Sequence, residues 1–315
     1  MKILILGAGA VGGYFGGRLV QAGGDVTFQV RSARAQQLAT RGLVIQSALG
    51  DATIKVKTIE QAAGTGPFDL VIVSCKAYDL TQAIAAIAPH VAAGAIVLPL
   101  LNGMRHNEDL RHRFGSDAMI GGMCQIEATL SQDGDIIHKS QFARMVFGPF
   151  EDFPAHARMQ RVLSEFAAIC GKANFTSNLT DPIDQSLWDK WVMISTLGGV
   201  TTLMRGAVGD VMAAREGREL IEEMLQEAIA VATENGYPPH ADYLSSIRKL
   251  LLAPGSTFMA SMLRDIERGN PVEADHIIGD MYRRAHDHGH DANVLRMVYC
   301  HLQTYEARRA RNGLK

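Results

Sequence analysis

Short apolar runs alternate with longer helix-like stretches over the first half of the chain. Several runs are almost continuous in Ile, Leu and Val, which is typical of strands that helices bury on both faces. The alternation of such strands with helices predicts βαβ units and a mainly parallel sheet. The runs that we expect to form strands are 2–9, 25–30, 69–76 and 95–103 and, with a less regular pattern, 118–128 and 144–149.

The second half of the chain has a different pattern. After 174–182 clear strand patterns end, and stretches such as 221–236 and 241–253 have the apolar spacing of helices. The sequence therefore predicts an α/β domain over residues 1–180, built on a doubly wound, mainly parallel sheet, and an all-helical domain over residues 181–315.

Composition and charge exclude several classes of protein. The 315 residues are 47% hydrophobic and 20% charged, as in a globular protein of two domains. The formal net charge of -2 provides no basic surface for nucleic acid or for an anionic membrane. No stretch approaches the roughly 18 apolar residues of a membrane span, and the apolar start is too short for a secretory signal. We therefore expect neither nucleic acid nor a membrane as a partner.

The four cysteines are far apart in the sequence and form no C-x-x-C pair. This spacing favours free thiols in a reducing compartment over a disulfide framework or a zinc ribbon. We therefore expect a cytoplasmic protein. The cysteines are Cys75, Cys124, Cys170 and Cys300.

Gly7, Gly9 and Gly12 form the pattern G-x-G-x-x-G, with Ala10 and Val11 between the last two glycines. The pattern follows the first expected strand and precedes a helix-like stretch. Such glycines make a tight turn, let the backbone approach a pyrophosphate and pack the helix against the strand. This context favours a dinucleotide site over a turn that only connects two elements.

The end of the second expected strand indicates which dinucleotide binds. An NAD site places an acidic residue there, about 20 residues after the glycines. The run 28–38 has Arg31 and Arg34 instead, and no Asp or Glu. Guanidinium groups suit a 2′-phosphate, so we predict NADPH/NADP as the cofactor, bound mainly by Arg31. Alternatively, both arginines only lie on an exposed helix start.

Lys76 and Asn102 lie at the carboxyl ends of the third and fourth expected strands. Ligands of open α/β sheets bind at the carboxyl ends of the strands, so both side chains are candidates for binding. The alternatives are a solvated loop lysine and the first residue of an Asn-Gly turn.

Lys190 lies on an apolar helical stripe in the run 186–199, with apolar residues three, four and seven positions further along. A lysine there is costly without a partner or a task. We predict a general acid whose pKa is lowered by partial burial. Alternatively, the aliphatic stem covers apolar surface and the ammonium reaches water.

Glu273 is preceded by Asn270, which resembles a helix N-cap, and by Pro271, which resembles a first helical residue. Glu273 would then be the third helical residue, where a carboxylate closes a capping box. This structural role competes with a catalytic one. Ser261 has no signal beyond being a small polar residue among apolar ones.

The histidines 286, 288 and 290 invite a metal site. Gly289 resembles the residue that ends a helix, and histidines suit the C-terminal end of a helix. We expect no metal.

Together these segments resemble the ketopantoate reductase family, the NADPH-dependent 2-dehydropantoate 2-reductases. The resemblance runs almost from end to end. The segments that carry it are GAGAVGGYFGGRL (7–19), SCKAYD (74–79), LLNGM (100–104), IIHKSQFARMVFGP (136–149), LWDKW (187–191) and SMLRDIERGNPVEADHIIG (261–279).

The resemblance implies a Rossmann domain joined to an all-helical domain, with the active site in the cleft between them. It also implies reduction of a 2-oxo acid, 2-dehydropantoate, to pantoate in pantothenate biosynthesis. In that case Lys190 is the general acid and Glu273 holds the substrate hydroxyl. Ser261 and Asn102 contact the substrate, and Lys76 lies near the nicotinamide and the substrate.

The chain differs from the family pattern at Ile194 and Gly198, where family members commonly carry asparagines that contact substrate. A reductase of a different 2-oxo acid therefore stays open, as does a 3-hydroxy acid dehydrogenase of similar architecture. A third alternative is a non-catalytic NADP-binding sensor, against which the retained Lys190 and Glu273 argue. The sequence leaves stereochemistry and oligomeric state open, a homodimer included.

Overall fold

The computed structural model of the chain describes residues 1–61, 66–153 and 155–313. The chain divides into two compact units. The first comprises Met1–Leu101 and His106–Asp184, and the second comprises Asn102–Arg105 and Gln185–Lys315. Four residues that follow the fourth predicted strand thus belong to the second unit.

The first unit contains a five-stranded sheet in which every pairing is parallel. Its strand order reverses between β1 and β6, as in a doubly wound nucleotide-binding fold, which confirms the predicted fold class. The spatial order is β5 (Lys57–Ile59), β2 (Asp25–Gln29), β1 (Lys2–Leu6), β6 (Leu70–Val73) and β7 (Ile96–Pro99).

A second sheet in the same unit is mixed. The predicted strands 118–128 and 144–149 form β8 and β9, which pair antiparallel in this second sheet, so their assignment to the parallel sheet was wrong. The spatial order is β10 (Thr176–Leu179), β9 (Ile136–Gly148), β3 (Leu43–Ser47) and β4 (Ala52–Ile54), with β8 (Gly121–Leu130) on β9.

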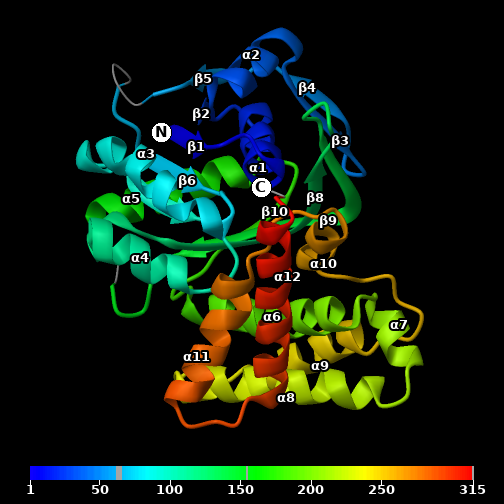
Figure 1. Cartoon of the computed structure of the whole chain (residues 1–315). Coiled ribbons are helices and arrows are strands. Elements are labelled where there is room, and N and C mark those ends of the chain that lie inside the picture. The colour runs from blue at the N-terminus through cyan, green and yellow to red at the C-terminus, as the bar shows by residue number, and fades with distance from the viewer. Residues whose placement is uncertain (62–65, 154, 314–315) are drawn as a thin grey trace. The chain divides into compact units, whose positions relative to one another are not determined.

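The helix that follows the glycine motif packs against strands of both sheets (Figure 1). Two of its glycines make this possible: a Cβ at Gly16 would lie 2.6 Å from the Phe28 ring, and one at Gly17 would lie 2.9 Å from Ile45. The helices of this unit are α1 (Ala10–Gln21), α2 (Ser32–Arg41), α3 (Leu80–Ala92), α4 (Arg105–Phe114) and α5 (Ala157–Cys170), with short 3-10 turns at Ala77–Asp79 and Ser116–Ala118.

The described part of the second unit is helical throughout. Its central helix α6 is buried on almost all sides, because its apolar residues are not confined to one stripe. The helices are α6 (Asp184–Met204), α7 (Val208–Ala213), α8 (Gly217–Glu234), α9 (Ala241–Leu251), α10 (Ser261–Glu267), α11 (Asp280–Asp287) and α12 (Asn293–Arg311), with a π-helical segment, η3, at Asp275–Gly279.

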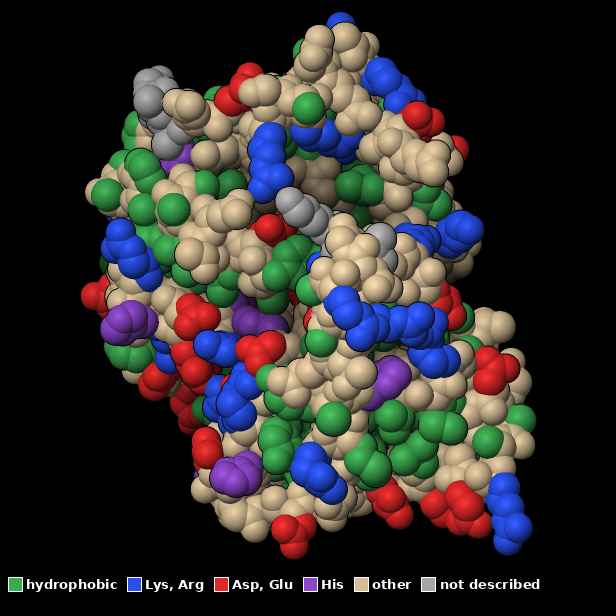
Figure 2. All heavy atoms as spheres, viewed as in Figure 1, with side chains coloured by type: hydrophobic (Ala, Val, Ile, Leu, Met, Phe, Trp, Pro, Cys, Tyr) green, Lys and Arg blue, Asp and Glu red, His purple; other side chains and the backbone are tan. Residues whose placement is uncertain are grey.

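Acidic and basic side chains are interspersed over the face of the molecule in Figure 2. None of the helices in the described residues is both long and apolar enough to cross a bilayer.

Candidate functional site

The glycine motif forms the turn between β1 and α1. Gly7 has a φ of +86°, a conformation that glycine adopts without strain. A Cβ at Gly12 would lie 2.9 Å from the Gly7 carbonyl oxygen, so only glycine fits there. A Cβ at Gly9 would meet nothing within 4 Å, and the first turn of α1 has no acidic side chain. The N–H groups at Ala10 and Val11 therefore suit a pyrophosphate.

The two arginines at the end of β2 differ in position. Arg31 is exposed, and its Nη2 donates to Oε1 of Gln82 at 3.2 Å. Arg34 is half-buried, and its Nη2 donates at 3.0 Å to the carbonyl oxygen of Ala8, inside the glycine turn. Burial lowers the pKa of Arg34. Both guanidinium groups thus lie at the edge of the predicted cofactor site.

An acidic residue that the sequence prediction missed also lies at the end of β2. Glu60 follows β5, which pairs with β2, and its carboxylate accepts a hydrogen bond from the hydroxyl of Ser32. It comes from a neighbouring strand, so the pattern of the run 28–38 gave no sign of it. A carboxylate here accepts a ribose hydroxyl and repels a 2′-phosphate, and it therefore opposes the arginines in the choice of cofactor.

Lys76 is half-buried at the end of β6 and precedes the 3-10 turn Ala77–Asp79. Its backbone carbonyl accepts the N–H of Asp79 at 2.9 Å. Because β6 pairs in parallel with β1, Lys76 and the glycine turn lie at the same edge of the sheet. This edge carries the carboxyl ends of the strands, where ligands of such sheets bind.

Lys190 and Asn102 are in direct contact. Nζ of Lys190 donates to Oδ1 of Asn102 at 2.8 Å, although the residues are 88 positions apart in the sequence. Lys190 is only 6% exposed, which argues against the alternative in which the aliphatic stem covers apolar surface and the ammonium is solvated. Gly103 has a φ of +84°, so the predicted Asn-Gly turn is also present. The turn brings an amide oxygen to a buried ammonium.

Glu273 is buried, with 4% of its surface exposed, but the predicted capping box was wrong. The helix begins only at Ala274, after Glu273. The N–H of Asn270, which a capping box would use, donates to the carbonyl oxygen of Asp265 at 2.9 Å. The N–H of Val272 donates at 2.7 Å to the carboxylate of Glu306. The capping box that competed with a catalytic role is therefore absent, and the carbonyl oxygen of Glu273 instead accepts the N–H of Ile277 at 3.0 Å, at the start of the helix.

The π-helical segment η3 begins two residues after Glu273, and its first residue, Asp275, contacts several charged groups. Asp275 accepts hydrogen bonds from Arg105 at 3.0 Å, Arg283 at 2.8 Å and the Tyr299 hydroxyl at 2.6 Å. Burial raises the pKa of Asp275, but the bonds from Arg283 and Tyr299 and the charge of Arg105 outweigh it and hold that pKa below its usual value. The sequence analysis missed this cluster because its members are dispersed along the chain.

Ser261 is exposed and is the first residue of α10. The next residue, Met262, packs on α6: a Cβ at Gly198 would lie 2.8 Å from the Met262 methyl carbon. Gly198 is two turns beyond Lys190 on α6. Ser261 therefore lies near a part of α6 that is about 12 Å beyond Lys190 along the helix.

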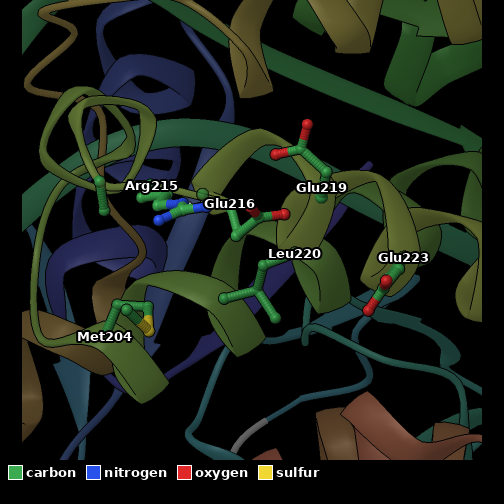
Figure 3. A pocket seen from close by; sticks show the side chains of 8 residues that line it. Met204, Arg215, Glu216, Glu219, Leu220 and Glu223 are labelled. Atoms are coloured by element: carbon green, nitrogen blue, oxygen red, sulfur yellow. Dashed lines mark ion pairs between the residues drawn. The ribbon is translucent and has the colours of Figure 1, made fainter.

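Two other features of the described residues do not indicate a site for this chemistry. They contain no group of three or more His, Cys, Asp or Glu side chains arranged to hold a metal ion. A hollow of about 330 Å³ lies where α6 ends and α8 begins (Figure 3). Three carboxylates line it, which disfavours an anionic ligand, and Met204 at its wall is about 21 Å from Lys190 along α6. The carboxylates are Glu216, Glu219 and Glu223.

Two family models match most of the chain. Residues 3–152 match the model described as Ketopantoate reductase PanE/ApbA, and residues 182–306 match Ketopantoate reductase PanE/ApbA C terminal. A Bacillus subtilis (strain 168) protein named uncharacterized oxidoreductase YkpB is 37% identical over 98% of this chain and 99% of its own length. A 2-dehydropantoate 2-reductase of Nostoc sp. (strain PCC 7120) is 25% identical over 98% and 96%.

Solved structures have the same fold over nearly the whole chain. The 2-dehydropantoate 2-reductase of Geobacter metallireducens GS-15 superposes with a TM-score of 0.86 at 28% identity, covering 96% of this chain and 99% of that one. A D-mandelate dehydrogenase solved with NADH and anilino(oxo)acetate has a TM-score of 0.85 at 21% identity, covering 98% and 100%. The second likeness shows the fold alone.

Proposed function

The chain belongs to the ketopantoate reductase family of oxidoreductases, which act on CH–OH groups, and from this premise we propose that it reduces 2-dehydropantoate to pantoate with NADPH. A hydride passes from NADPH to the carbonyl carbon, and a proton passes to the carbonyl oxygen. The relatives named 2-dehydropantoate 2-reductase support this choice of substrate.

The contact between Lys190 and Asn102 carries the proposal. The ammonium of Lys190 is buried, and its 2.8 Å hydrogen bond to the Asn102 amide oxygen favours the protonated form. A protonated, desolvated ammonium stabilises the negative charge that develops on the carbonyl oxygen and then protonates it. Solvent restores the proton to Lys190 after each turnover.

The residues of the first unit suit the cofactor. The glycine turn and the start of α1 would hold the pyrophosphate, and Arg31 with Arg34 would hold a 2′-phosphate. NADPH supplies the hydride when bound. Glu60 opposes this choice, but two guanidinium groups outnumber one carboxylate, so we propose NADPH over NADH.

Glu273 and Ser261 complete the proposed substrate site. Glu273 accepts a hydrogen bond from the 4-hydroxyl of 2-dehydropantoate, and Ser261 contacts the acid from the start of α10. Lys76 lies near the nicotinamide and the substrate. The burial of Glu273 and the contact of the following segment η3 with Gly103, next to Asn102, support this assignment.

The test is a titration with NADPH followed by steady-state oxidation of NADPH with a panel of 2-oxo acids, 2-dehydropantoate first. The proposal predicts saturable turnover with 2-dehydropantoate. Turnover only with another 2-oxo acid would assign that acid as the substrate instead. Oxidation of 3-hydroxy acids alone would favour a 3-hydroxy acid dehydrogenase. Binding of NADPH without any turnover would favour a sensor.

The proposed reaction needs a small-molecule substrate as its partner. The four free cysteines support the cytoplasm as the compartment. A homodimer stays a prediction.

A further inference from the structure

The π-helical segment η3 is an uncommon element, and it lies next to Glu273 of the proposed substrate site. Helices with i→i+5 hydrogen bonds are rare and occur often at functional sites. This one begins two residues after Glu273 and ends where α11 begins, at Asp280. A poorly favoured local geometry needs contacts from neighbouring elements to persist.

Trp191 supplies one such contact. Its ring is 1% exposed, and its Nε1–H donates to the carbonyl oxygen of Ile277, in the middle of η3, at 3.0 Å. The N–H of Ile277 in turn donates to the carbonyl oxygen of Glu273 at 3.0 Å. Two hydrogen bonds thus link the residue beside Lys190 to the backbone of Glu273.

Gly103 supplies a second contact. It follows Asn102, and a Cβ there would lie 2.8 Å from the carbonyl oxygen of His276. The turn that carries Asn102 therefore lies directly against η3. The segment η3 thus contacts Trp191, next to Lys190, and Gly103, next to Asn102. It begins two residues after Glu273.

We propose that Trp191 is a positioning residue, whose indole N–H holds η3 in register so that Glu273 keeps a fixed place relative to the Lys190–Asn102 pair. Trp191 does not touch the reacting atoms in this account. The inference rests on the proposed function, since it takes these three residues as the site. It adds a tryptophan and a π-helical segment as the parts that keep the site in its geometry.

The test compares Trp191→Phe with Trp188→Phe. Both tryptophans are buried on α6, but Trp188 packs against the rings of Tyr237 and Trp191, whereas Trp191 also donates to Ile277. We expect Trp191→Phe to lower kcat about tenfold or more and to change KM for NADPH less than about threefold, because misplacement affects the chemical step. Trp188→Phe should change kcat less than about twofold. A kcat for Trp191→Phe within about twofold of that control overturns the inference.

A second pair of variants covers the case in which Trp191→Phe does not fold. Gly103→Ala should displace the Asn102 turn from η3, and Gly236→Ala is its control. Gly236 has a similar φ of +89°, and a Cβ there meets nothing within 4 Å. A tenfold larger loss of kcat in Gly103→Ala supports the inference, and equal losses overturn it.

Hydrogen exchange separates this inference from the proposed function. If the wild-type protein reduces no 2-oxo acid, the proposed function fails, and amide exchange over residues 273–283 then decides the positioning role. Faster amide exchange in this segment in Trp191→Phe than in Trp188→Phe supports the proposal that Trp191 holds η3 in register. Equal exchange in the two variants overturns it.

Discussion

The hydrogen bond between Lys190 and Asn102 determines where the activity should fall off at high pH. The amide oxygen of Asn102 accepts from the ammonium at 2.8 Å and so stabilises the protonated form of Lys190, the proposed acid. A hydrogen bond to a charged group is worth about 1.5 to 3 kcal/mol. Since one pH unit corresponds to about 1.4 kcal/mol, Asn102→Ala should move the alkaline limb of kcat/KM down by about one to two units.

Asn102→Asp should move the same limb in the opposite direction, because a carboxylate beside the ammonium favours its protonated form. The assay is kcat/KM against pH with the proposed 2-oxo acid, since this ratio reports on the free protein. Both variants also lose a proposed substrate contact, so their rates fall at every pH, and only the position of the limb is diagnostic. Ser261→Ala is the control, which should lower the rate without moving the limb. An unmoved limb in both Asn102 variants would refute the assignment of Lys190 as the acid.

Three further changes test the other assignments. Arg31→Ala should lower the preference for NADPH over NADH about tenfold or more through loss of a charge-assisted phosphate contact, whereas Glu60→Gln should raise that preference; paired kinetics with both cofactors measure this. Lys190→Ala should lower kcat about 10²-fold or more and leave NADPH binding nearly intact in a fluorescence titration, and loss of cofactor binding or of folding would make the residue structural. Glu273→Gln should lower kcat/KM about tenfold to a hundredfold on 2-dehydropantoate and less on 3,3-dimethyl-2-oxobutanoate, which lacks only the hydroxyl; equal losses on both would remove the hydroxyl contact.

The sequence predicted the parallel sheet because its strands are buried on both faces and read as continuous apolar runs. It did not predict β3, β4 or β5, the last an edge strand of the parallel sheet, because these strands are short and partly exposed and have no such pattern. Burial of α6 on almost all sides likewise exceeds what a single stripe indicated. The local sequence pattern identifies an element when its apolar residues form one clear run or one clear stripe. The short strands and α6 have no such run or stripe.

The sequence analysis named the residues of the candidate site but not the contacts among them. The pattern at Asn270 and Glu273 predicted a capping box, and the structure lacks one because the helix begins only at Ala274 and the N–H of Asn270 donates to the carbonyl oxygen of Asp265. The bond between Lys190 and Asn102 and the approach of Glu60 to Ser32 join residues far apart in the sequence. Such contacts depend on tertiary packing, which no local pattern encodes.

The measurement that tests the central claim most directly follows the hydride itself. The protein is incubated with NADPH carrying deuterium at the transferred position of the nicotinamide and with 2-dehydropantoate, and the product is analysed by mass spectrometry and NMR. The account predicts pantoate with one deuterium at C2, formed in step with oxidation of the cofactor. A cofactor that stays reduced, or a product without deuterium at C2, would contradict it.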